Sequence, residues 1–268
     1  MTEIVGRYVE VRGRQAYYEA CGEGPAIVAI HTAGREGRQW HGVMQALAGR
    51  YHMFVPDLPG HGKSWPLAGN ACLQDAHEIA QWLREFAAVV VGDSFIITGC
   101  SLGGNLSLLL AAVAPEVRAA VALQGCDHTP TFTETALDLM THPQVSLMHA
   151  NMDFSMSLVG SEATPEGRAF SEWGVLSIIP VAQQGDLRAY GRCGIRPLMD
   201  KVKVPVLLAH GSEDWLASRE MVEATRGRLV NAPLVRMVPL PGLGHFPHLE
   251  APGRVADMML TFFDEAGL

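Results

Sequence analysis

The residue most able to do chemistry in this chain is Ser101, the centre of the sequence Gly-Cys-Ser-Leu-Gly-Gly at residues 99–104. An apolar run, 94–98, precedes it, and an apolar helical pattern, 105–113, follows it. A G-x-S-x-G sequence between a strand and a helix is typical of a nucleophile elbow, a strained turn that lifts a serine hydroxyl above a sheet. Glycines on both sides allow the backbones to cross closely. We therefore expect Ser101 to be a catalytic nucleophile rather than an idle serine in a glycine-rich turn.

A serine hydroxyl needs a base to take its proton and an acid to orient that base. In enzymes with this elbow, the three groups follow in the order serine, acid, histidine. Asp214 comes after the apolar run 204–209, and His245 lies in a loop rich in glycine and proline after the run 234–238. The imidazole of histidine exchanges protons near neutral pH. The sequence therefore predicts a triad in which Asp214 orients His245 and His245 activates the serine.

Alternatives to this assignment remain open from the sequence. Asp214 could serve only as the cap of the next helix, and its neighbour Glu213 could replace it as the acid. Asp127 is a further candidate for the acid because it follows a strand at the same edge of the sheet. His248 competes for the role of base, but we expect it to begin the last helix and to point away.

Stabilising an oxyanion requires two N–H donors. Leu102, directly after the nucleophile, supplies one at the start of a helix, where the helix dipole is also favourable. We expect Ala33 to supply the other, because a small residue in the loop 31–34 lets the backbone approach a substrate. Arg35 and Arg38 follow this loop. They are either solvated surface charges or contacts for an anionic group of the substrate, and we take Arg38 as a candidate substrate-binding residue.

The elements that must position these residues alternate between buried strands and helices. Apolar runs indicate strands at residues 26–30, 51–56, 94–98, 119–123, 204–209 and 234–238. Helical patterns are expected at 40–47, 73–91, 105–113, 219–229 and 255–263, and a hairpin at 8–11 and 15–19. This alternation predicts an α/β fold, with a mostly parallel central sheet covered by helices on both faces. Active sites of such sheets lie at the carboxyl ends of the strands.

The alternation breaks once, between residues 127 and 200. This segment has helical patterns, no convincing buried strand and several methionines. We therefore expect residues 1–126 and 201–268 to form the core, and residues 127–200 to form a helical cap insertion over the active site. Methionine adapts to irregular apolar shapes, so part of the set Met152, Phe154 and Met156 is expected to line a substrate pocket. Packing inside the cap is an open alternative for each of them.

Four stretches make the chain resemble the α/β-hydrolase fold superfamily nearly from end to end. Residues 31–34 are similar to the family's oxyanion loop, and residues 57–64 to its D-x-P-G-x-G-x-S loop. Residues 99–104 are similar to its elbow, and residues 211–214 and 244–246 to its acid and histidine loops. Thr32 departs from the usual glycine, and its hydroxyl would offer a third oxyanion donor. A serine at the elbow, in place of aspartate, separates the chain from the haloalkane dehalogenases and epoxide hydrolases.

The resemblance implies a capped serine hydrolase of the esterase type, which needs neither a metal nor an organic cofactor. We expect it to cleave a carboxylic ester or lactone of a small, partly apolar molecule through an acyl-enzyme. A carbon–carbon bond hydrolase acting on a dioxo acid would use the same residues and favour an arginine near the site. A small-molecule receptor on a hydrolase fold would bind its ligand under the cap with little or no turnover.

Composition excludes several other classes of protein. The chain has 268 residues, of which 48% are hydrophobic, and this suffices for a sizeable core. Its net charge of -8, without a basic run, argues against binding to nucleic acid. No apolar stretch approaches the roughly 20 residues of a membrane span. We therefore expect a small-molecule substrate as the partner, no nucleic acid and no membrane, and we leave a homodimer open.

Cysteine and histidine usage argues against a metal site or a disulfide framework. The five cysteines include no C-x-x-C pair, and residues 1–4 do not begin a signal-peptide pattern, so we expect a cytoplasmic protein. His128, His142 and His149 could gather round a metal, but scattered surface or cap histidines are the favoured interpretation.

Overall fold

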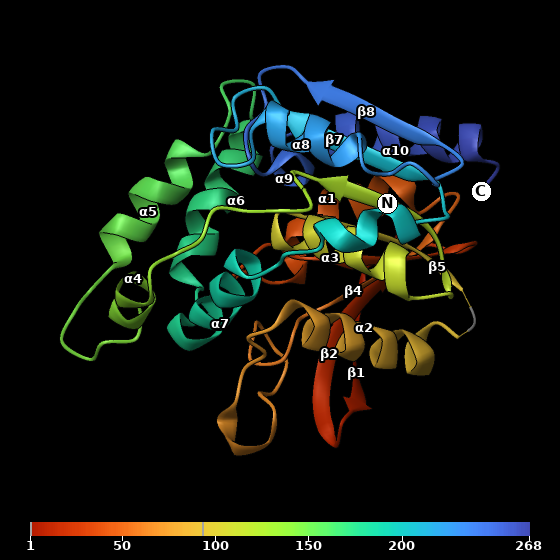
Figure 1. Cartoon of the computed structure of the whole chain (residues 1–268). Helices are drawn as coiled ribbons and strands as arrows, with labels where there is room; N and C mark the ends of the chain where they lie inside the picture. Colours follow the sequence, from red (N-terminus) through yellow and green to blue (C-terminus); the bar gives the residue numbers. More distant parts are fainter. Residues whose placement is uncertain (1, 93) are drawn as a thin grey trace.

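The fold is described by a computed structural model that covers residues 2–92 and 94–268 (Figure 1). In that part of the chain, eight strands form one sheet in the order β1-β2-β4-β3-β5-β6-β7-β8. The strands are β1 (Val5–Val11), β2 (Arg14–Cys21), β3 (Ala26–Ile30), β4 (His52–Pro56), β5 (Phe95–Cys100), β6 (Val117–Leu123), β7 (Val206–Gly211) and β8 (Val235–Leu240). Strands β1 and β2 form the expected hairpin, and β2 pairs antiparallel with β4. All remaining pairs are parallel, which confirms the predicted sheet.

Helices connect the parallel strands close to the predicted places. They are α1 (His41–Leu47), α2 (Ala76–Val90), α3 (Leu102–Val113), α4 (Glu134–Leu139), α5 (Met148–Ser157), α6 (Pro165–Leu176), α7 (Pro180–Gly191), α8 (Arg219–Arg226), α9 (Pro247–Glu250) and α10 (Pro252–Ala266). The described residues also include three 3-10 helices, at Gly37–Trp40, Ala68–Asn70 and Arg196–Lys201. Helix α2 begins later than expected because Asp75 caps it, accepting hydrogen bonds from the backbone N–H groups of His77 and Glu78.

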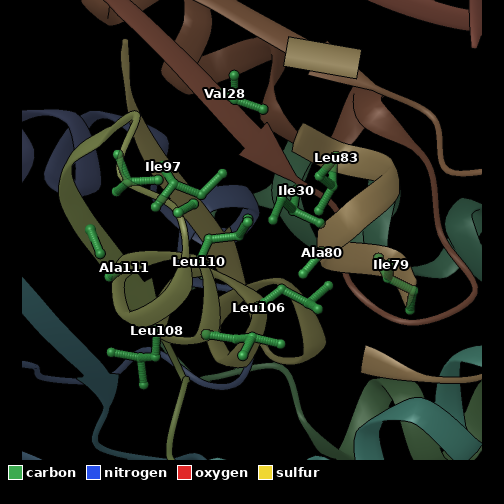
Figure 2. Packing of buried hydrophobic residues seen from close by; sticks show 14 of the residues in the cluster. Val28, Ile30, Ile79, Ala80, Leu83, Ile97, Leu106, Leu108, Leu110 and Ala111 are labelled. Atoms are coloured by element: carbon green, nitrogen blue, oxygen red, sulfur yellow. The ribbon is translucent and has the colours of Figure 1, made fainter. Parts of the chain in front are cut away.

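Both faces of the sheet are buried under helices, because the side chains of each strand alternate between them. On β3, Val28 and Ile30 join a core with α2, α3 and α8, whereas Ile27 and Ala29 join a second core with α1 and α10. Figure 2 shows part of this first core, to which Ile97 of β5 and apolar side chains of α2 and α3 also belong. Two apolar layers therefore hold the carboxyl ends of the central strands in place.

The segment between β6 and β7 carries the helices α4, α5, α6 and α7, which we call the cap helices. Figure 1 shows them together on one side of the molecule, at the end toward which β8 points. Backbone atoms tie them to the core: the N–H of His245 donates to the carbonyl oxygen of Leu158 at 2.8 Å. The side chain of Trp215 donates to the carbonyl oxygen of Ser157 at 3.1 Å. The division into a core and a separate cap domain stays a prediction.

Candidate active site

Ser101 lies at the sharp turn between β5 and α3, with backbone angles φ 59° and ψ -118°. Residues other than glycine rarely adopt a positive φ, so this turn is strained. A Cβ atom on Gly99 would lie 2.3 Å from the carbonyl carbon of Gly103, and one on Gly103 would lie 2.6 Å from the carbonyl oxygen of Ile30. Both glycines are therefore required. The N–H of Ser101 donates to the carbonyl oxygen of Leu123 at 2.9 Å, which holds the turn against β6.

His245 and Asp214 are brought together from the loops that follow β8 and β7. The Nδ1 atom of His245 lies 2.7 Å from Oδ2 of Asp214, and both side chains are buried. Because an ionised carboxylate only accepts hydrogen bonds, Nδ1 carries the proton and Nε2 remains free to accept one. The other oxygen, Oδ1, accepts from the N–H groups of Leu216 at 2.8 Å and Ala217 at 3.3 Å. Asp214 therefore orients the imidazole and also fixes its own loop.

Among residues 32–35 of the loop after β3, one N–H group has no acceptor in the described part of the chain. The N–H of Thr32 donates to Gln39, that of Gly34 to Asp186, and that of Arg35 to the carbonyl oxygen of Thr32. No residue within the described ranges accepts from the N–H of Ala33. Leu102 occupies the first position of α3, where an N–H has no partner inside the helix. The hydroxyl of Thr32 donates to Gln39 at 3.1 Å, so this threonine does not offer the third donor that the sequence suggested.

The competing acids and the competing histidine have other partners. Asp127 is held by Arg228 at 2.9 Å and by His128 at 2.7 Å. Glu213 accepts from the N–H and the hydroxyl of Ser161. His248 does not begin the last long helix but lies in the short helix α9, where it packs against Trp40 with 4.5 Å between ring centres. Burial lowers the pKa of His248 to about 3, so its imidazole is neutral.

Ser101 and His245 line one cavity of about 200 Å³. The cap helices supply much of its apolar lining. Helix α5 presents Asn151, Phe154 and Ser155 to it, and Leu158 follows at the C-cap of that helix. These residues are three, four and seven positions apart, which is the spacing of one helix face. Met152 and Met156 fall outside that face and do not line the cavity. Of the three cap residues predicted from the sequence, the structure brings Phe154 alone to the site.

The structure also places Arg35 at this cavity in place of Arg38. The guanidinium of Arg38 forms an ion pair with Glu36 and lies 4.4 Å over the ring of Trp173. Arg38 therefore does not line the cavity, and its contact with substrate stays a prediction from the sequence. Arg35 is buried, and its Nη2 atom donates to the hydroxyl of Ser155 at 2.6 Å.

Glu250 contacts the backbone around His245, which the sequence analysis did not predict. Its buried carboxylate accepts from the N–H groups of Gly160 at 3.0 Å, Gly244 at 2.7 Å and Phe246 at 2.9 Å. Burial raises its pKa, although these hydrogen bonds oppose the rise. Glu250 therefore positions the backbone on both sides of His245. The signal was an acidic residue between the apolar residues Leu249 and Ala251, five residues after the histidine.

Asp186 on α7 connects the cap helices to two loops of the core. Its Oδ2 atom accepts from the N–H of Gly34 at 2.7 Å and lies 3.0 Å from Nε2 of His61. All three residues are buried. Burial alone would lower the pKa of His61, but the charge and hydrogen bond of Asp186 outweigh it, so the net pKa is raised. The pair therefore holds the oxyanion loop under α7.

The described residues, 2–92 and 94–268, contain no group of three histidine, cysteine or acidic side chains arranged to hold a metal ion. None of the helices there is long and apolar enough to cross a membrane.

The chain matches the model of the alpha/beta hydrolase family over residues 27–258. A pimeloyl-[acyl-carrier protein] methyl ester esterase from Nitrosomonas europaea is 28% identical over 252 residues, covering 88% of this chain and 94% of the relative. A magnesium-chelatase 30 kDa subunit from Rhodobacter capsulatus is 26% identical over 262 residues, covering 90% of this chain and 88% of the relative. Among solved structures, the enol-lactonase from Burkholderia xenovorans LB400 superposes with a TM-score of 0.85 at 18% identity, covering 96% of this chain and 100% of that one.

These matches, the sheet topology and the elbow agree with one another. The chain belongs to the alpha/beta hydrolase family. The fold and the family that the sequence predicted are thereby confirmed.

Proposed function

We propose that this protein is a serine hydrolase that cleaves a carboxylic ester or lactone of a small, partly apolar molecule. One observation carries the proposal: Ser101, on its strained elbow, shares a cavity with His245, and Asp214 holds that imidazole with its proton on Nδ1. A nucleophile, an oriented base and two N–H donors are the parts that acyl transfer requires.

In the proposed reaction, the hydroxyl oxygen of Ser101 attacks the ester carbonyl while Nε2 of His245 takes the hydroxyl proton. The N–H groups of Leu102 and Ala33 stabilise the resulting oxyanion. The imidazolium then gives its proton to the leaving alcohol, and the acyl group remains on the serine. A water molecule gives a proton to Nε2 of His245 and attacks the acyl carbon. The bond from that carbon to the serine oxygen then breaks, the imidazolium returns its proton to this oxygen, and the acid is released.

The names of the relatives support this class of reaction. The relative from Nitrosomonas europaea is named as a methyl ester esterase, and the similar structure from Burkholderia xenovorans is named as a lactonase. Ester and lactone hydrolysis both proceed by acyl transfer. The net charge of -8 supports a small-molecule substrate over nucleic acid. The cytoplasmic location and a homodimer stay predictions from the sequence.

The test is covalent labelling with a fluorophosphonate followed by peptide mapping. The label should attach to Ser101, and Ser101→Ala should lose both the labelling and about 10⁴-fold or more of the esterase activity. Ser157→Ala, at an exposed serine of α5, is the matched control and should behave like the wild type. Labelling at another serine, or full activity of Ser101→Ala, would overturn the proposal.

A carbon–carbon bond hydrolase acting on a dioxo acid is the second candidate, because Arg35 at the cavity suits an acidic substrate. Assays distinguish ester hydrolysis from carbon–carbon bond hydrolysis. One protein preparation is assayed on dioxo acids and on esters that carry a carboxylate at the matching position. Cleavage of dioxo acids with negligible ester turnover would favour the second candidate. Stable binding of either ligand without turnover would instead favour a receptor.

A further inference from the structure

Arg35 is a buried cation without a buried anion to match it. It is 7% exposed, and it lines the cavity that contains Ser101 and His245. Nη2 donates to the neutral hydroxyl of Ser155, and Nη1 has no hydrogen-bond partner among the described residues. No carboxylate in the described part of the chain forms an ion pair with Arg35. The neighbouring Glu36 is already paired with Arg38.

The other buried charges near this site do have partners. Asp214 is bound to His245, and Asp186 to His61. Burial lowers the pKa of Arg35 to about 10, which still leaves the guanidinium charged at neutral pH. Burying an unpaired charge is unfavourable unless a counter-charge arrives. The missing partner is therefore expected in whatever fills the cavity.

We propose that Arg35 binds a carboxylate of the substrate, so that the preferred substrate is an ester or lactone that also carries a free carboxylate. This inference rests on the proposed function and narrows its substrate class. The planar guanidinium matches the geometry of a carboxylate and remains charged where an ammonium would not. The hydroxyl of Ser155 lies beside Nη2 and can donate a further hydrogen bond. Leu137, Met140 and Ile178 give the rest of the cavity an apolar lining for the carbon chain.

The guanidinium also contacts two of the cap helices, through Ser155 of α5 and Gly174 of α6. A Cβ atom on Gly174 of α6 would lie 2.7 Å from Nη1, so a glycine there leaves room for the arginine. The same contacts also suit a different role, in which Arg35 only ties α5 and α6 to the core. A structural role would affect the cleavage of charged and neutral esters equally. A carboxylate-binding role would affect the charged esters more, so an experiment can distinguish the two roles.

The experiment compares esters that differ only in charge. The monomethyl esters of glutaric, adipic and pimelic acid carry the carboxylate on the acid side, with methyl pentanoate, hexanoate and heptanoate as neutral partners. In 4-acetoxybutanoate the carboxylate is on the alcohol side of the ester, and butyl acetate is its neutral partner. We expect the wild type to have a higher kcat/KM for the charged member of at least one series. Arg35→Met should reduce that ratio by about 10- to 100-fold, the effect of losing a hydrogen bond between charged groups.

Two variants serve as controls. Arg38→Met removes an equal charge three residues away, and Arg219→Met removes one from the exposed end of α8. Neither should change the ratio. If Arg35→Met does not fold, Arg35→Lys keeps the charge without the planar fork and should give an intermediate ratio. The proposal is overturned if the wild type prefers neutral esters in every series, if Arg35→Met and Arg35→Lys lower both members equally, or if the ratio depends on Arg38.

Calorimetry separates this proposal from the proposed function. Ser101→Ala should bind monomethyl adipate or 4-acetoxybutanoate, and adding Arg35→Met should weaken that binding by at least about 10-fold. Binding that depends on Arg35 without ester cleavage by the wild type would support the carboxylate site and overturn the hydrolase. Cleavage of neutral esters together with binding that ignores Arg35 would support the hydrolase and overturn the carboxylate site.

Discussion

The carboxylate of Asp214 divides its two oxygens between His245 and the backbone of its own loop. Asp214→Asn should therefore keep the fold, because an amide oxygen can still accept from the N–H groups of Leu216 and Ala217. The amide nitrogen would then face Nδ1 and force the proton onto Nε2, which removes the base. We expect kcat to fall about 10⁴-fold with little change in Tm.

Asp127→Asn is the matched control, because Asp127 pairs with Arg228 away from the cavity. It should retain kcat and lose stability. If Asp127→Asn lost most of kcat while Asp214→Asn kept it, the catalytic acid would be the residue after β6 and our assignment would be wrong.

Phe154 and Met152 test which face of α5 contacts substrate. Phe154 lines the cavity, whereas Met152 does not. Phe154→Ala should change the relative kcat/KM across a series of acyl chain lengths by roughly 1–3 kcal/mol per lost contact. Met152→Ala should leave that profile unaltered. A profile that changes with Met152 and is indifferent to Phe154 would mean that the helix is turned differently in solution.

Glu250→Gln should disturb the histidine loop without touching the imidazole. The carboxylate accepts three backbone N–H groups, whereas a glutamine amide has one acceptor oxygen and would turn its NH₂ toward at least one of them. We expect a loss of about 1–3 kcal/mol in stability and a lower kcat. Thermal melting and steady-state kinetics measure both. Glu213→Gln, at an exposed carboxylate, should be nearly neutral; equal effects of the two substitutions would argue against a special role for Glu250.

The pair of His61 and Asp186 should make stability depend on pH. The folded-state pKa of His61 is raised above its ordinary value of 6.5. Its contribution to stability is therefore complete below about pH 6.5 and is lost as the pH rises through the folded-state pKa. The Tm of the wild type should fall more steeply from about pH 6 to pH 9 than that of His61→Gln. His77→Gln, at an exposed histidine, should follow the wild type, and parallel curves for all three proteins would contradict the assignment.

The sequence predicted the sheet, the elbow and the family because each depends on local patterns. A buried strand is a short apolar run, and the strained turn at Ser101 requires glycines at fixed positions. The lining of the cavity has no such local signal. Methionine and phenylalanine occur around much of α5, so apolar character alone could not choose its inner face. The contact of Asp186 with His61 joins residues 125 positions apart, and only the folded chain reveals it.

The hydrogen bond from the N–H of His245 to Leu158 has a consequence for protein engineering. The peptide that carries the proposed base is bound to the segment just after α5, and Glu250 bridges the same place through Gly160. The cap helices are therefore not an interchangeable lid. A chimaera that takes these helices from another family member would have to keep residues 158–160, or accept a displaced histidine. Directed evolution of specificity should instead vary the cavity-lining face of α5 and leave residues 158–160 unchanged.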